Sequence, residues 1–202
     1  MRTQIDHDER IREMLDKSLG LFSEFGYDNL TFQQIADSTG VNRTSIYKYF
    51  ANKRQLFGAA LRQMLENVAH DFQQRLADLP EVGAGVKLET LLLEIAELLY
   101  NNYGMLRCIY DYLDDQQRQG EDVARKVRSY TVAFHLTLKQ ILREGVKSGE
   151  FQNVNTKAAA NLFYALLEAL ASRIAISHSV GKWEEVKDEI VLAVSLLKRT
   201  KS

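Results

Sequence analysis

The sequence predicts an all-α protein of about nine helices, in which an N-terminal three-helix domain precedes a larger helical bundle. The 202 residues include one proline and eleven glycines, so long stretches lack residues that break helices. Apolar residues recur at helical spacing through most of the chain, and no segment alternates long enough to predict a strand. A composition of 46% hydrophobic and 26% charged residues fits a globular protein with a sizeable core.

The first helix is expected to begin at Asp6, whose carboxylate can cap the backbone while Glu9 reaches back. Apolar residues then form one face from Ile11 to Phe25, and Gly26 follows in the position of a C-terminal cap. This pattern predicts a single amphipathic helix up to Gly26.

A helix, a tight turn and a short helix are predicted between Thr31 and Tyr49. Thr31 opens the first of these with Gln34 at the capping-box position, and Gly40 permits the turn. The short helix is expected from about Asn42 to Tyr49. The small core that would fix their crossing consists of Ile35, Ala36, Val41 and Ile46. This arrangement is the geometry of a helix-turn-helix.

Longer helices are expected in the rest of the chain. Asn52 caps a fourth helix that continues towards Leu76, and the pattern pauses over residues 78–85, which hold the proline. The later helices are expected from Leu88 to near residues 101–104, from Leu106 to near Gly120, from Val123 to Gly145, over residues 158–176 and from about residue 183 to 198.

The charge distribution marks the helix-turn-helix region as cationic, although the net charge of the chain is only -1. Between Thr39 and Leu65 every charged residue is basic: Arg43, Lys48, Lys53, Arg54 and Arg62. A local basic patch fits the displacement of counterions from nucleic-acid phosphates, and the alternative is a solvated helix face. The solvent side of the short helix would present Arg43, Thr44, Tyr47 and Lys48 to bases or phosphates.

This segment resembles the DNA-binding signature of the TetR family (tetracycline-repressor, AcrR-like regulators). The resemblance covers roughly residues 8–65 and depends on anchor residues in one order. These anchors are Gly26, Thr31, Ile35, Ala36, Gly40, Val41, Tyr47, Phe50, Lys53 and Leu56. The resemblance implies a transcriptional regulator, in most members a repressor that binds a palindromic double-stranded DNA operator as a homodimer and is released by a small-molecule effector.

The resemblance also implies roles for single residues. Thr31 would hold a phosphate at a helix start, and Lys53 would contact another phosphate. Arg43, Thr44 and Lys48 would meet bases, while Tyr47 and Tyr49 would brace phosphates. Asn42 stands where the family often has serine, and its side chain can still cap the short helix. For Tyr47 the alternative is a role as a packing aromatic. The DNA-binding domain is expected over residues 1–52 and the ligand-binding and dimerisation domain over residues 53–202.

The middle helices hold the candidates for an effector pocket, which needs apolar walls and a few polar groups. These are Tyr100, Tyr103, Arg107, Cys108, Tyr110, Tyr130, Phe134 and His135. For any one of them the alternative is an ordinary structural role: a buried histidine for His135, a surface position for Arg107 and a buried thiol for Cys108.

Residues 158–176 are apolar over much of the helix circumference, which requires cover on more than one side. The resemblance places the dimer interface in the last two helices, so we expect a four-helix interface from helices eight and nine.

The same sequence argues against other classes of protein. Its scattered histidines, single cysteine and lack of phosphate-binding or nucleophile motifs predict no enzyme, no metal and no cofactor. We expect a cytoplasmic protein without a transmembrane helix, because no uninterrupted apolar run is long enough. Two alternatives stay open: a family member that needs no ligand, and a helical binder or enzyme whose helix-turn-helix is incidental.

Overall fold

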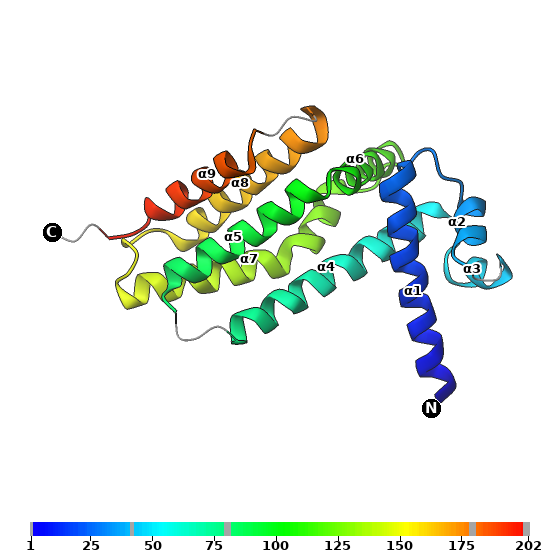
Figure 1. The fold of residues 1–202 in the computed structure, drawn as a ribbon, viewed down its shortest axis with the longest axis horizontal. Coiled ribbons are helices and arrows are strands. Elements are labelled where there is room, and N and C mark those ends of the chain that lie inside the picture. The colour runs from blue at the N-terminus through cyan, green and yellow to red at the C-terminus, as the bar shows by residue number, and fades with distance from the viewer. Residues whose placement is uncertain (1, 41–42, 79–81, 178–180, 200–202) are drawn as a thin grey trace. The chain divides into compact units, whose positions relative to one another are not determined.

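The structure is a computed structural model that describes residues 2–40, 43–78, 82–177 and 181–199. Within these residues the regular structure consists of nine α-helices and an isolated antiparallel bridge between Phe151 and Lys198. The helices are α1 (Arg2–Phe25), α2 (Phe32–Ser38), α3 (Arg43–Tyr49), α4 (Lys53–Asp78), α5 (Ala84–Asn101), α6 (Tyr103–Arg118), α7 (Val123–Ser148), α8 (Thr156–Ser177) and α9 (Trp183–Ser195) (Figure 1). The predicted all-α class is confirmed.

The helices divide between two compact units. Unit 1 comprises Met1–Val68 and Gly104–Lys126, so α6 belongs to the same unit as α1, α2, α3 and the first part of α4. Unit 2 comprises Ala69–Tyr103 and Val127–Ser202. The compact unit that holds the helix-turn-helix thus continues past residue 52, and the functional division at that residue stays a prediction.

The core of unit 1 is aromatic. Phe22 from α1, Phe57 from α4 and Tyr112 from α6 are all buried, together with Tyr27 from the loop after α1. The ring of Phe57 lies edge-on to Phe22 at 4.7 Å and contacts Tyr112 at 4.9 Å. Such aromatic pairs stabilise a core beyond the burial of their surface, so α6 is firmly packed onto the N-terminal helices.

Most helix ends follow the sequence prediction, with one difference at the start. Helix α1 begins at Arg2 rather than at Asp6, because no proline or glycine interrupts the preceding residues. Gly26 ends α1 with φ +86°, the left-handed cap that was predicted. Asn52 caps α4 as expected, since its Oδ1 accepts a hydrogen bond from Gln55 N at 3.0 Å.

The end of α7 corrects the prediction that this helix stops at Gly145. The helix continues to Ser148, and the chain turns at Gly149 with φ +78°. Gly145 serves packing instead, because a Cβ atom there would lie 2.1 Å from the ring of Phe151. Helix α9 likewise ends before the expected Lys198, which pairs with Phe151 in the isolated bridge.

Unit 2 is a helical bundle in which α5 packs against both α8 and α9 (Figure 1). Glu150, in the turn after α7, caps the start of α5: its carboxylate accepts hydrogen bonds from Ala84 N at 2.7 Å and Gly85 N at 2.8 Å. Lys87 and Glu144 form an ion pair at 3.2 Å between α5 and α7. These polar contacts fix the ends of the bundle helices.

Helix α8 is the most apolar element. The segment Thr156–Ile176 is long and apolar enough to cross a membrane by length and composition, and 33% of the tested window is buried. The sequence prediction of no transmembrane helix considered only uninterrupted apolar runs, and it assigned residues 158–176 to a helix interface instead. One such helix is weak evidence for a membrane span, because core and interface helices have the same composition.

Candidate nucleic-acid interface

Helices α2 and α3 form the predicted helix-turn-helix. Gly40 adopts φ +70°, which favours glycine and allows the chain to turn between the two helices. Ile35 and Ala36 from α2 and Ile46 from α3 are fully buried, as expected for the core that fixes the helix crossing. The fourth predicted core residue, Val41, lies outside the described residues.

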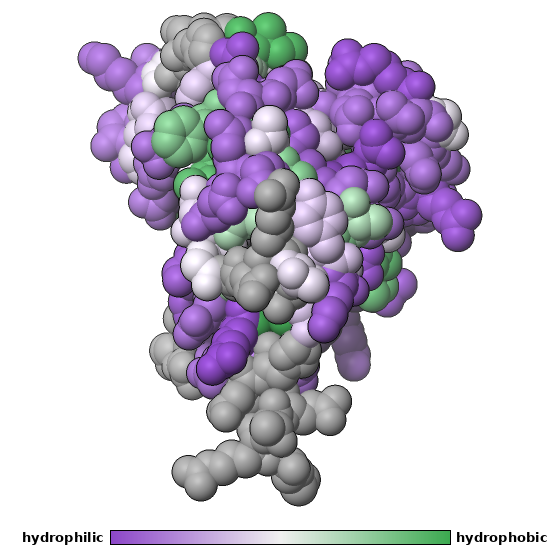
Figure 2. All heavy atoms as spheres, turned by 90° about the vertical axis from the view of Figure 1, so that its right-hand side faces the viewer, coloured by the Kyte–Doolittle hydropathy of each residue, from purple (hydrophilic) through white to green (hydrophobic). Residues whose placement is uncertain are grey.

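The side of α3 opposite Ile46 carries the predicted DNA-contacting side chains. Thr44 and Lys48 are exposed, and Tyr47 and Tyr49 are 47% and 37% exposed. Figure 2 views the end of the molecule that carries α2 and α3, and most of its visible side chains are hydrophilic. Asn42 lies outside the described residues, and Arg43 is described only by its place at the start of α3.

Thr31 caps α2 through the predicted capping box. Its backbone N donates to Gln34 Oε1 at 2.9 Å, and its Oγ1 accepts from Gln34 N at 3.2 Å. The side chain of Thr31 is exposed, so the start of α2, with its positive end of the helix dipole, faces solvent. This geometry can receive a phosphate oxygen.

The side chain of Tyr47 is partly exposed and also packs against a neighbouring ring. Its ring lies edge-on to Phe32 with centroids 4.8 Å apart, so α3 and the start of α2 share an aromatic contact. The packing alternative for Tyr47 and its predicted contact with a phosphate are therefore compatible.

Lys53 has a role that the sequence did not predict. Its Nζ donates to the backbone oxygen of Tyr27 at 2.6 Å and lies 4.4 Å from the centroid of the Tyr27 ring. Burial lowers the pKa of Lys53 from its ordinary value. Lys53 thus holds the loop after α1 in place, and its contact with a phosphate stays a prediction.

Asp115 on α6 organises a polar network beside the helix-turn-helix. Its Oδ2 accepts hydrogen bonds from Arg54 Nε at 2.9 Å and from the hydroxyl of Tyr27 at 3.1 Å. The hydrogen bond from Arg54 lowers the pKa of Asp115, whereas burial and this carboxylate raise the pKa of Tyr27. Sequence analysis missed the network because no local spacing relates residues that are 61 positions apart.

The predicted effector residues are divided between the units. In unit 1, Cys108 is buried and its Sγ donates to Phe22 O at 2.8 Å, while Arg107 and Tyr110 are exposed. Burial raises the pKa of Cys108 to about 11, so the thiol is protonated near neutral pH. Cys108 therefore has a packing role in unit 1.

In unit 2, the hydroxyl of Tyr100 donates to Gly181 O at 3.4 Å, and its ring contacts Trp183. The ring centroids of His135 and Tyr164 lie 4.3 Å apart with the planes tilted by 42°, and the Phe134 ring lies 6.4 Å from that of Tyr164. Tyr103 is half-buried, and nothing is described of the Tyr130 side chain. The aromatic cluster around His135 is the part of the predicted set that the structure brings together.

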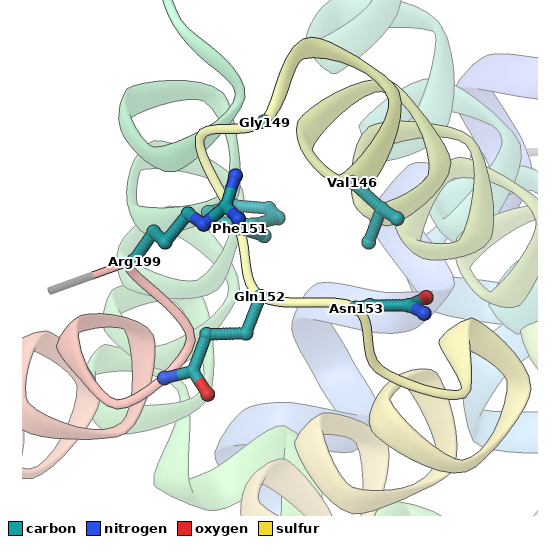
Figure 3. Close-up of a pocket in the computed structure, with 6 residues that line it drawn as sticks. All are labelled: Val146, Gly149, Phe151, Gln152, Asn153 and Arg199. Carbon is teal, nitrogen blue, oxygen red and sulfur yellow. The ribbon is translucent and has the colours of Figure 1, made fainter.

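A hollow of about 410 Å³ lies elsewhere in unit 2, where the chain leaves α7. Figure 3 shows Arg199 beside Phe151 at one side of it and Val146 at the other. The lining residues are Val146, Gly149, Phe151, Gln152, Asn153 and Arg199. Within the described parts of the chain, no three histidine, cysteine or carboxylate side chains gather where they could hold a metal ion.

The segment with this geometry matches a known family. Residues 14–60 match the sequence profile described as "Bacterial regulatory proteins, tetR family". The matched residues, about a quarter of the chain, are thus similar to the DNA-binding segment of this family. This match confirms the predicted resemblance of the helix-turn-helix segment to that of tetR-family regulators.

Curated transcriptional regulators resemble the chain to different extents. The HTH-type transcriptional regulator RutR of Escherichia coli is 38% identical over 55 residues, which are 27% of this chain and 26% of RutR. The chain thus spans about a quarter of the length of RutR. The Fatty acid metabolism regulator protein of Bacillus subtilis is 24% identical over 161 residues, 77% of this chain and 78% of that protein.

Solved structures of TetR-family regulators share the fold. A TetR transcription regulator from Haloarcula marismortui superposes with a TM-score of 0.80 at 19% identity, covering 95% of this chain and 100% of that one. FadR from Bacillus subtilis, in complex with stearoyl-CoA, superposes with a TM-score of 0.72 at 18% identity, covering 90% and 96%. These similarities confirm the predicted architecture.

Proposed function

We propose that this protein is a cytoplasmic repressor that binds a palindromic DNA operator as a homodimer and leaves it when a small molecule binds the C-terminal domain. It acts by binding rather than by catalysis. The observation that carries the proposal is the polar side of α3, where Thr44, Tyr47 and Lys48 are exposed while Ile46 is buried. A short helix held by its apolar side and presenting donors on the other can enter a major groove.

The proposed contacts with DNA have two kinds. Arg43, Thr44 and Lys48 read base edges, while Thr31, Tyr47, Tyr49 and Lys53 position the helix on phosphates and Asn42 caps α3. The capping box at Thr31 supports this assignment, because it presents an ordered helix start to solvent. Of these residues Lys53 has the weakest support for a phosphate contact, because its ammonium group already donates a hydrogen bond to the backbone oxygen of Tyr27.

The proposed dimer forms through α8 and α9. Leu162 and Ile176 on α8 are 70% and 73% exposed, and Leu192 on α9 and Leu196 at its C-cap are 61% and 69% exposed. Large apolar side chains on two neighbouring helices require cover, and the same face of a second copy supplies it in a four-helix arrangement. Two recognition helices about 34 Å apart would then reach successive major grooves.

The proposed effector shifts the dimer towards a conformation in which the two recognition helices are wrongly spaced for the operator. Acyl compounds are the first class to test, because the structurally similar FadR was solved with stearoyl-CoA. The predicted pocket candidates are Tyr100, Tyr103, Arg107, Cys108, Tyr110, Tyr130, Phe134 and His135. Of these, His135 and Phe134 have the strongest support, since they cluster with Tyr164.

The experiment that tests the function maps the DNA that the purified protein protects near its own coding region. We expect a palindromic site whose affinity falls with salt, and release of this site by acyl compounds. Arg43→Ala should weaken operator binding by about 1–3 kcal/mol and relax one base position. A monomer that ignores duplex DNA would refute the proposal, whereas specific binding that no ligand relieves would favour a ligand-independent regulator.

A further inference from the structure

The hollow at the end of α7 is built from two chain segments that hydrogen bonds tie together. The segment after α7 runs beside the segment after α9, because Gln152 N donates to Leu197 O at 2.9 Å and Arg199 N donates to Glu150 O at 3.0 Å. The side chain of Gln152 adds two weaker bonds, since its Nε2 donates to two backbone oxygens of the segment after α9. These contacts hold the walls of the hollow in place.

Two polar side chains that line the hollow are available to a ligand. Within the described part of the chain, neither the guanidinium of Arg199 nor the amide of Asn153 has a hydrogen-bond or ion-pair partner. Figure 3 shows Arg199 beside Phe151, whereas Asn153 extends on the side of Val146. The donors of Arg199 and the amide of Asn153 therefore lie at two sides of one space.

The positive charge of Arg199 is not balanced by the groups around the hollow. Arg199 is the one charged residue among the described lining residues. The carboxylate of Glu150, which precedes Phe151, accepts hydrogen bonds from two backbone amides at the start of α5 instead. Two carbonyl oxygens in the last turn of α7 are also occupied, since they accept hydrogen bonds from Gly149 N and Phe151 N. The hollow therefore favours an anionic ligand.

We propose that this hollow binds a small carboxylic acid with an apolar, ring-sized body. The planar guanidinium of Arg199 can donate two parallel hydrogen bonds to a carboxylate, and Asn153 can orient the ligand from the other side. Val146 and Phe151 supply apolar walls, and the volume of about 410 Å³ is in the range of small-molecule sites. A bare inorganic anion would leave these walls without contact.

The bound acid would connect the two segments that flank the proposed dimer helices. Asn153 lies shortly before α8 begins at Thr156, and Arg199 follows the end of α9 at Ser195. A ligand held between them would also raise the thermal stability of the protein, since it binds the folded chain only. This site shares no residue with the aromatic cluster around His135, and it does not depend on the proposed binding of DNA.

The test titrates the isotope-labelled full chain with benzoate, benzyl alcohol, acetate and inorganic phosphate, followed by the amide resonances of Gly149, Gln152 and Asn153. We expect benzoate to shift these resonances. Benzyl alcohol, which has the ring without the charge, and acetate, which has the charge without the ring, should each bind at least about ten-fold more weakly. Phosphate should bind more weakly than benzoate as well.

Three variants locate the ligand. Arg199→Met should weaken benzoate binding by at least about ten-fold, and its backbone N retains the bond to Glu150. Val146→Phe keeps the charge but fills part of the hollow, so it should weaken benzoate binding too. Arg143→Met is the matched control: Arg143 is an exposed arginine on α7 outside the lining, and its loss should leave benzoate binding unchanged.

The outcomes decide the proposal in separate ways. Absence of benzoate binding, or equal affinity of native protein and Arg199→Met, would overturn it. Phosphate binding as tight as benzoate would contradict the apolar body, and full affinity in Val146→Phe would place benzoate outside the hollow. Should Val146→Phe fail to fold, Arg199→Met against Arg143→Met decides alone. A protein that ignores duplex DNA but binds benzoate through Arg199 would refute the repressor function and retain this site.

Discussion

The carboxylate of Asp115 accepts a hydrogen bond from the guanidinium of Arg54, with Nε and Oδ2 2.9 Å apart. The same oxygen accepts the hydroxyl of Tyr27 at 3.1 Å. Tyr27 precedes α2 and Arg54 lies in the first turn of α4, so these two residues flank the helix-turn-helix. One side chain on α6 therefore holds both ends of the segment that carries the recognition helix.

Asp115→Asn should lower the free energy of unfolding by about 1–3 kcal/mol, since it removes the charge from two hydrogen bonds in a half-buried place. Denaturant unfolding at fixed protein concentration measures this, because the stability of a dimer depends on concentration. Asp114→Asn is the control: its ion pair with Arg118 is exposed, and its loss should change stability by less than about 1 kcal/mol. If the two substitutions lower the free energy of unfolding equally, the hydrogen bonds of Asp115 have no special role in stability.

Acid should weaken this contact selectively. The hydrogen bond from Arg54 holds the pKa of Asp115 below its ordinary value. A lowered pKa in the folded protein contributes stability that is complete above pH about 4 and is lost as the pH falls through the folded value. The difference in unfolding free energy between the native protein and Asp115→Asn should therefore shrink from pH 7 towards pH 3. A difference that grows in acid would contradict the assignment.

The sequence predicted the helices and the helix-turn-helix because both depend on local signals. Gly26, Gly40 and the capping box at Thr31 each act within a few residues, and each is found as predicted. Contacts between distant helices have no such signal. The pairing of Asp115 with Arg54 follows from the packing of α6 onto α1 and α4, which periodicity alone does not reveal.

The predicted end of α7 at Gly145 was wrong for the same reason. Gly145 has a helical environment and a neighbouring ring from Phe151, and only the tertiary structure brings that ring close. The sequence therefore predicts the end of the helix at Gly145, whereas in the structure this glycine lets the Phe151 ring lie close to the α7 backbone. The division of the effector candidates between two compact units also depends on packing that no single helix encodes.

Gly145→Ala should destabilise the protein by about 1–3 kcal/mol, because the added methyl group would overlap the Phe151 ring. Gly20→Ala in α1 is the matched control, since its Cβ would meet nothing within 4 Å and alanine favours helix. The control should stabilise the protein by about 0.5–1 kcal/mol. Thermal unfolding of both variants measures the contrast, and two changes of the same sign would refute the packing role of Gly145.

Leu192→Glu should dissociate the proposed dimer, because it would place a charge in the apolar face formed by α8 and α9. Leu136→Glu on α7 is the control, since Leu136 and Leu192 are both 61% exposed. Sedimentation of the two variants at equal concentration measures the oligomeric state. A dimer that tolerates Leu192→Glu would place the interface elsewhere, whatever the effect on DNA binding.

Tyr47→Phe separates the two roles of Tyr47. The phenylalanine ring keeps the edge-on contact with Phe32, so the fold and thermal stability should change little. Loss of the hydroxyl should weaken operator binding by about 0.5–1.5 kcal/mol and equally for all sequence variants of the site, since a phosphate contact carries no base information. Lys48→Ala is the contrasting variant, because a base contact should relax the preference at one position. Binding to a set of single-base operator variants distinguishes the two, and unchanged affinity of Tyr47→Phe would leave Tyr47 with packing as its only role.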